Sequence, residues 1–112
     1  MRLLLPQLAL ALMTGAVGFD GPAAVTIKTF GFGPKVLQVT AGTTVVWTNE
    51  DDIEHTITSG APDRPDGAFD HALAAKGATA SVRFDTAGTW SYFCTRHSFM
   101  RGEIRVVPKG ER

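Results

Sequence analysis

The sequence has a single cysteine among its 112 residues, so the chain cannot form an intramolecular disulfide. Its 11 basic and 11 acidic residues balance to a formal charge of zero, which argues against nucleic acid and polybasic membrane contacts. No apolar run reaches the roughly 20 residues that a transmembrane helix needs, and no segment carries a sustained helical stripe. The sequence is therefore interpreted as a small β-rich domain, and its single thiol needs a functional explanation.

The first residues have the pattern of a secretory signal peptide. A basic start is followed by an apolar stretch, and Ala16 and Gly18 stand at the minus-three and minus-one positions of a cleavage site. We therefore expect a signal peptide over residues 1–18 and one mature domain over residues 19–112, without stable membrane insertion. A lipid anchor is excluded because its acceptor would be a cysteine near the cleavage point, whereas the only cysteine is Cys94. In an oxidising compartment a lone thiol is a hazard unless something occupies it.

Downstream of residue 23, apolar residues alternate with polar ones between turn residues, which predicts a sandwich or barrel of short strands. Residues 59–67 contain two glycines and two prolines and are expected to form a loop, and the pattern of 68–74 fits either a strand or a helical turn. Strands are expected at 24–29, 35–39, 43–48, from His55 to Thr58, and at 79–84, 89–94 and 102–107.

The run from Cys94 to Met100 puts a thiolate, an imidazole and a thioether into one short loop, in the spacing Cys94, His97, Met100. Each residue alone has an ordinary interpretation, as a buried thiol, a surface histidine or core filler. Together with His55, at the start of an upstream strand, they form the ligand set of a blue-copper centre. A structural zinc site would use Cys and His without Met.

Enzymatic alternatives find little support in the sequence. Oxidases with several coppers need His-x-His pairs, and a binuclear centre needs a second cysteine in the loop; neither is present. A nucleophilic pair of Cys94 and His97 lacks an orienting third group and leaves Met100 unexplained. His71, the third histidine, has no second donor at metal spacing and is interpreted as a surface residue.

The chain resembles a small cupredoxin of the plastocyanin and amicyanin type over nearly all of its mature length. The resemblance rests on Phe30-x-Phe32-x-Pro34, Ala41-Gly42-Thr43-x-Val45-x-Trp47-x-Asn49, Phe69-Asp70, the segment from Phe84 to Gly88, and Cys94-Thr95-x-His97-x-Phe99-Met100-Arg101-Gly102. It implies an eight-stranded Greek-key β-sandwich with one copper ion bound by His55, Cys94, His97 and Met100.

The function implied by this resemblance is that of a mobile, monomeric one-electron carrier in the periplasm. Its redox partners would be an electron donor and an acceptor, such as a dehydrogenase or a c-type cytochrome. The alternative is a copper storage or delivery protein of the same fold. Delivery favours a Met-rich or His-rich exchangeable site, and the mature chain has only Met100.

The resemblance also implies that His97 presents its ring edge to solvent within an apolar patch. Phe99, Pro34, Phe32 and Ala68 are the candidates for that patch, although Phe32 fits a core position equally well. Charged residues near this end are interpreted as ordinary solvated surface; they are Glu50, Asp51, Asp52, Glu54, Arg64, Arg96 and Arg101.

Three positions depart from the family pattern. Thr56 replaces the asparagine that often follows the first histidine ligand and joins the two ligand loops. Arg96 and Ser98 stand where amicyanin-like loops tend to carry prolines, which restores two backbone N–H groups. We hypothesise that one of these amides donates to the Cys94 sulfur and raises the reduction potential.

Overall fold

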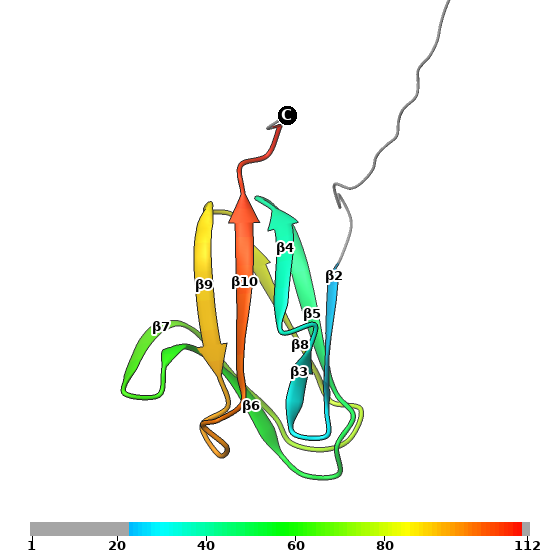
Figure 1. Ribbon diagram of the computed structural model, residues 1–112. Helices are drawn as coiled ribbons and strands as arrows, with labels where there is room; N and C mark the ends of the chain where they lie inside the picture. Colours follow the sequence, from blue (N-terminus) through cyan, green and yellow to red (C-terminus); the bar gives the residue numbers. More distant parts are fainter. Residues whose placement is uncertain (1–22, 111–112) are drawn as a thin grey trace, which may run out of the picture.

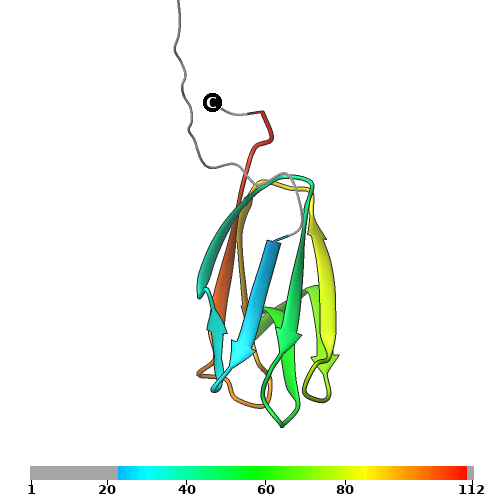
Figure 2. The same ribbon diagram turned by 90° about the vertical axis from the view of Figure 1, so that its right-hand side faces the viewer.

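The computed structural model describes residues 23–110, which fold into two β-sheets packed face to face and contain no helix (Figures 1 and 2). The all-β sandwich predicted from the alternating pattern is confirmed. The expected signal peptide, residues 1–18, lies outside the described residues. Among residues 23–110, no helix is long and apolar enough to span a membrane.

Each sheet combines antiparallel pairs with one parallel pair. The larger sheet has the order β4 (Val36–Thr40), β10 (Arg101–Val107), β9 (Gly88–Phe93), β6 (His55–Ala61) and β7 (Arg64–Leu73). The smaller has the order β3 (Gly31–Gly33), β2 (Ala23–Lys28), β5 (Thr43–Asn49) and β8 (Thr79–Phe84). The parallel pairs are β4 with β10 and β2 with β5.

The alternation along β5 shows how the sequence selects this fold. Thr43, Val45, Trp47 and Asn49 are buried, while the residues between them are only partly covered. A period of two sends alternate side chains to opposite faces of a sheet, so one face of β5 enters the core. There the ring of Trp47 packs edge-on against Tyr92 from the other sheet, with ring centroids 5.3 Å apart.

Two details differ from the sequence-based prediction. The segment 59–67 is not a loop, because β6 continues to Ala61 and β7 begins at Arg64. The buried hydroxyl of Ser59 accepts a hydrogen bond from the Phe69 amide at 2.9 Å and donates to the Phe69 carbonyl at 3.1 Å, which holds the two strands together beside a bulge. The described residues form nine strands rather than eight, because Gly31–Gly33 pairs with β2 as a short separate strand.

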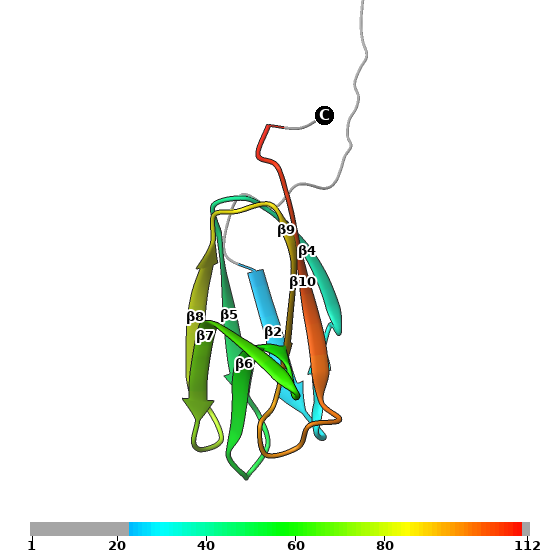
Figure 3. The ribbon, with the colours of Figure 1, turned by 90° about the vertical axis from the view of Figure 1, so that its left-hand side faces the viewer.

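Four connections lie at one end of the sandwich (Figures 1 and 3). They are the turn between β2 and β3, the link from β5 to the start of β6, the link from β7 to β8, and the loop from β9 to β10. His55 opens β6 as predicted, and Cys94 directly follows β9. The fold therefore brings the upstream histidine and the downstream ligand run to the same end.

Candidate metal centre

Three of the four predicted donors lie together at this end. The ligand atoms of His55, Cys94 and His97 all lie within 4.8 Å of one another. The Cys94 sulfur is 3.8 Å from Nδ1 of His55 and 4.0 Å from Nδ1 of His97. His55 and Cys94 are fully buried, and His97 is partly exposed. One sulfur and two ring nitrogens thus face a common point beneath the surface.

Met100 closes the loop that carries the other two downstream donors. Its amide donates to the His97 carbonyl at 2.8 Å, and its carbonyl accepts from the Cys94 amide at 3.2 Å. The Met100 side chain is buried and belongs to the apolar core. These two backbone bonds fix the loop without the prolines that the resemblance led us to look for.

Thr56 joins β6 to the ligand loop. Its amide donates to the Cys94 sulfur at 3.4 Å, and its hydroxyl accepts from the Thr95 amide at 2.9 Å. A threonine thus makes the connection between the two ligand loops that the resemblance led us to expect from an asparagine. The hypothesis that Arg96 or Ser98 supplies the amide to the sulfur is wrong, because Thr56 is the only residue within 23–110 whose backbone amide donates to that sulfur.

Asp51 has a role at this site that sequence reasoning missed. Its Oδ2 lies 2.9 Å from Nε2 of His55, and its two oxygens accept hydrogen bonds from the Thr29 and Phe30 amides at 2.7 and 3.0 Å. Burial raises the pKa of the Asp51 carboxyl, but the amides of Phe30 and Thr29 and the ring of His55 lower it by more, so the pKa lies below its usual value. The interpretation of Asp51 as ordinary solvated surface is wrong.

The bond to Asp51 determines which nitrogen of His55 is free. An ionised carboxylate only accepts hydrogen bonds, so Nε2 carries the proton in the neutral ring. Nδ1, which faces the Cys94 sulfur, then keeps its lone pair. His55 is therefore held in the form that can coordinate a metal through Nδ1.

Apolar rings surround the partly exposed His97. Phe30 lies edge-on to it with centroids 4.9 Å apart, and Phe99 lies 6.1 Å away. Phe99 is 69% exposed and Phe30 is 41% exposed. We call Phe30, His97 and Phe99 the His97 patch. Phe99 was expected here, whereas Phe30 was missed because only the β2–β3 turn brings it to this end.

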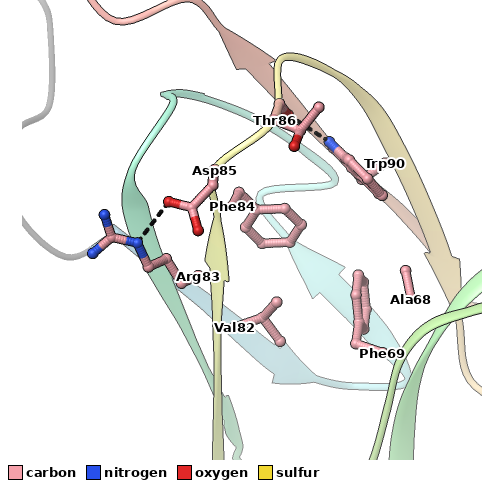
Figure 4. Close-up of a pocket in the computed structure, with 8 residues that line it drawn as sticks. All are labelled: Ala68, Phe69, Val82, Arg83, Phe84, Asp85, Thr86 and Trp90. Carbon is pink, nitrogen blue, oxygen red and sulfur yellow. Dashed lines mark hydrogen bonds and ion pairs between the residues drawn. The ribbon is translucent and has the colours of Figure 1, made fainter.

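Two of the other patch candidates, Phe32 and Ala68, lie elsewhere. Phe32 is buried and packs against Tyr92 in the core, with centroids 4.7 Å apart. Pro34 is exposed in the link between β3 and β4. Ala68 borders a shallow pocket of about 220 Å³ together with Phe84 and Trp90, where the exposed Arg83 and Asp85 form an ion pair (Figure 4). None of the four predicted donors lines that pocket.

Arg96, Arg64 and His71 contribute little to the site. Arg96 pairs with Glu54 at 2.9 Å across the two ligand loops, but both side chains are substantially exposed, and such pairs stabilise weakly. Arg64 begins β7 opposite Ala61, far along the strand from Leu73, which pairs with His55. His71 is exposed on β7, opposite Ile57, as the prediction of a surface residue required.

The donor set fits copper better than other common metals. Thiolate and thioether are soft ligands that select Cu(I), and imidazole suits both oxidation states. A cysteine and two histidines with a methionine held nearby is the combination of blue-copper electron-transfer sites. The fold and this donor set define the chain as a small copper protein.

Comparison with known proteins agrees. Residues 21–107 match the family model described as copper binding proteins, plastocyanin/azurin family. The chain is 36% identical to plastocyanin from Scenedesmus fuscus over 84% of its own length and 98% of that protein. It is 33% identical to amicyanin from Paracoccus denitrificans over 78% of its own length and 66% of that protein.

Solved structures give the same picture. A purple cupredoxin from Nitrosopumilus maritimus aligns with a TM-score of 0.70 and 26% identity, covering 76% of this chain and 99% of that one. The Cu(I) form of an amicyanin variant aligns with a TM-score of 0.65 and 32% identity, covering 80% of this chain and 85% of that one. The chain belongs to the plastocyanin/azurin family of copper-binding proteins, and its cofactor is copper.

Proposed function

We propose that this protein is a type 1 blue-copper electron carrier in which His55, Cys94, His97 and Met100 hold one copper ion. The observation that carries the proposal is the convergence of the Cys94 sulfur and the two histidine nitrogens within 4.8 Å, beneath the His97 patch. A bound copper ion supplies one-electron chemistry by alternating between Cu(I) and Cu(II). The protein's residues determine how readily that exchange occurs.

Each donor has a separate role in this proposal. Cys94 would hold the copper ion through its thiolate, His55 and His97 through ring nitrogens, and Met100 through its thioether, which would tune the reduction potential. Backbone bonds from Cys94 and Met100 close the ligand loop, and Thr56 joins it to β6. Because these hydrogen bonds hold the ligand loop and fix it to β6, the positions of the donors need to change little between the two oxidation states of copper.

The His97 patch is the proposed route for electrons. His97 is the only one of the four donors that is not buried, and the exposed rings of Phe30 and Phe99 lie around it. A small apolar surface of this kind suits brief contacts with redox partners, which have small interfaces and dissociate quickly. The partners we propose are a donor and an acceptor protein, such as a dehydrogenase and a c-type cytochrome.

We further propose that the protein works in the periplasm as a monomer, after export by the signal peptide expected at residues 1–18. A role in copper storage or delivery is less well supported, because His55, Cys94 and Met100 are at most 2% exposed. A delivery site needs ligands that an acceptor can reach. The same burial favours a metal that stays bound through many redox cycles.

The test is electron exchange with a soluble c-type cytochrome, followed by stopped-flow absorption. We expect the reduced copper protein to transfer one electron per copper, to keep its copper through repeated cycles, and to react at least several-fold more slowly in Phe99→Ser with an unchanged visible spectrum. Phe84→Leu, far from the patch, is the control. Loss of copper to a chelator within a few cycles would favour the delivery function instead.

A further inference from the structure

The Asp51 carboxylate makes three hydrogen bonds that connect separate parts of the copper end. Oδ1 accepts from the Thr29 amide at 2.7 Å, and Oδ2 accepts from the Phe30 amide at 3.0 Å and lies 2.9 Å from Nε2 of His55. The Asp51 side chain is only 14% exposed, and the side chain of His55 is fully buried. One carboxylate therefore holds both a proposed ligand, His55, and the turn that carries Phe30 of the His97 patch.

The turn needs this support. Thr29 and Phe30 are both non-glycine residues with positive φ, at 53° and 59°. Two such residues in succession form the tight hairpin turn that Asn-Gly usually occupies, and side chains with a Cβ adopt it reluctantly. The two amides that donate hydrogen bonds to Asp51 belong to these two residues. The carboxylate therefore stabilises the turn that places Phe30 against His97 and His55.

The hydrogen bond between Asp51 and His55 affects how His55 would bind the metal. A carboxylate that accepts a hydrogen bond from the outer nitrogen of a ligating histidine fixes the tautomer and the ring orientation, and makes the inner nitrogen a stronger donor. Asp52, one residue further on, is exposed and makes no hydrogen bond or ion pair among the described residues. Comparing substitutions of Asp51 and Asp52 therefore separates the effect of the contact with His55 from the effect of removing a negative charge near the site.

We propose that Asp51 is a positioning residue that holds His55 in its metal-binding tautomer and lowers the reduction potential of the copper site. The proposal rests on the copper-carrier function proposed above. A stronger His55 donor favours Cu(II), the harder ion, more than Cu(I), which the soft sulfur ligands already hold. The carboxylate therefore stabilises the oxidised state relative to the reduced one.

The test compares Asp51→Asn with Asp52→Asn, which removes the same charge without touching His55. In either orientation of the new amide, His55 loses its carboxylate partner. We expect Cu(II) affinity to fall about 10- to 100-fold in Asp51→Asn, with a smaller loss for Cu(I). A tenfold difference between the two losses corresponds to a rise of about 59 mV in the one-electron potential. Asp52→Asn should change either affinity by much less.

A second variant separates the turn from the histidine. Thr29→Gly accepts positive φ without strain, so Thr29→Gly/Asp51→Asn should regain much of the Tm lost in Asp51→Asn while its potential stays raised. If Asp51→Asn alone folds poorly, the reduction potential is measured on this double variant instead. Recovery of both Tm and potential would overturn the proposal, because Asp51 would then act through the turn alone.

A measurement without copper makes the test independent of the carrier function. Nitrogen-15 NMR of the wild-type apoprotein near neutral pH should show the neutral ring of His55 protonated at Nε2, and Asp51→Asn should populate the Nδ1 tautomer. A wild-type ring protonated at Nδ1, or equal potentials in Asp51→Asn and Asp52→Asn, would overturn the proposal with the blue-copper function intact. A wild-type protein that binds no copper would instead overturn the proposed function.

Discussion

The Thr56 amide lies 3.4 Å from the Cys94 sulfur and donates a hydrogen bond to it. This contact joins residues 38 positions apart in the sequence, at the point where β6 begins and β9 has just ended. The Thr56 hydroxyl adds a second connection through the Thr95 amide. The proposed thiolate ligand is thus held from the upstream strand as well as by its own loop.

Replacing Thr56 by Val tests the hydroxyl connection separately from the amide. The backbone bond to sulfur remains, but the Thr95 amide loses its acceptor, so we expect a loss of about 1 kcal/mol in the free energy of unfolding. Urea unfolding of the apoprotein measures this. Thr56→Ser keeps the hydroxyl and is the matched control, and equal stability of the two variants would show that the hydroxyl contributes nothing.

Replacing Met100 by Leu removes the thioether while keeping a buried apolar side chain of similar volume. Such swaps usually cost less than about 1.5 kcal/mol, so the variant should fold. Replacing the thioether by a hydrocarbon side chain makes the surroundings of a bound copper ion less polar, which favours the lower charge of Cu(I), so the reduction potential should rise. Voltammetry measures the change. An unchanged potential in a folded, copper-loaded variant would mean that Met100 is core filler rather than a ligand.

Replacing Gly102 by Ala should destabilise the fold through its cross-strand neighbour. Gly102 pairs with Tyr92, and a Cβ at Gly102 would overlap the Tyr92 ring. Forcing additional atoms into a packed core typically costs about 1–3 kcal/mol. Thermal unfolding should show this loss for Gly102→Ala and little change for Gly31→Ala, where the nearest atom to the new Cβ is 3.7 Å away.

Tyr92 is the single tyrosine, so its ionisation can be followed without interference. Burial raises the pKa of Tyr92 to about 12 from 10.0, and the indole of Trp47 lowers it by less. The unfolded chain releases this proton first, so its contribution to stability is complete below pH 10 and is lost as the pH rises towards 12. Near-ultraviolet absorption should show phenolate forming near pH 12 in the folded protein and near pH 10 in denaturant. Equal midpoints would contradict the burial of Tyr92.

The sequence predicted the sandwich and most of its strands because alternation and turn residues act locally. His55, Cys94 and His97 could be brought together from the sequence because His55 opens one predicted strand, Cys94 ends another, and His97 follows Cys94 by three residues in the same loop. Asp51 could not be recognised, because its role depends on a turn 21 and 22 residues upstream, whose positive φ values leave no signal in Thr29 and Phe30. Ala68 was misplaced because the segment 59–67 folds as a hairpin rather than as a loop.

The most direct test of the central claim is the visible absorption spectrum of the purified mature protein after addition of Cu(II) and then ascorbate. We expect an intense band from charge transfer between the Cys94 thiolate and Cu(II), saturating at one copper per chain. Ascorbate should bleach it and reoxidation restore it, and Cys94→Ala should lack it entirely. A protein that stays colourless with Cu(II) bound, or binds only Cu(I), would contradict the blue-copper carrier.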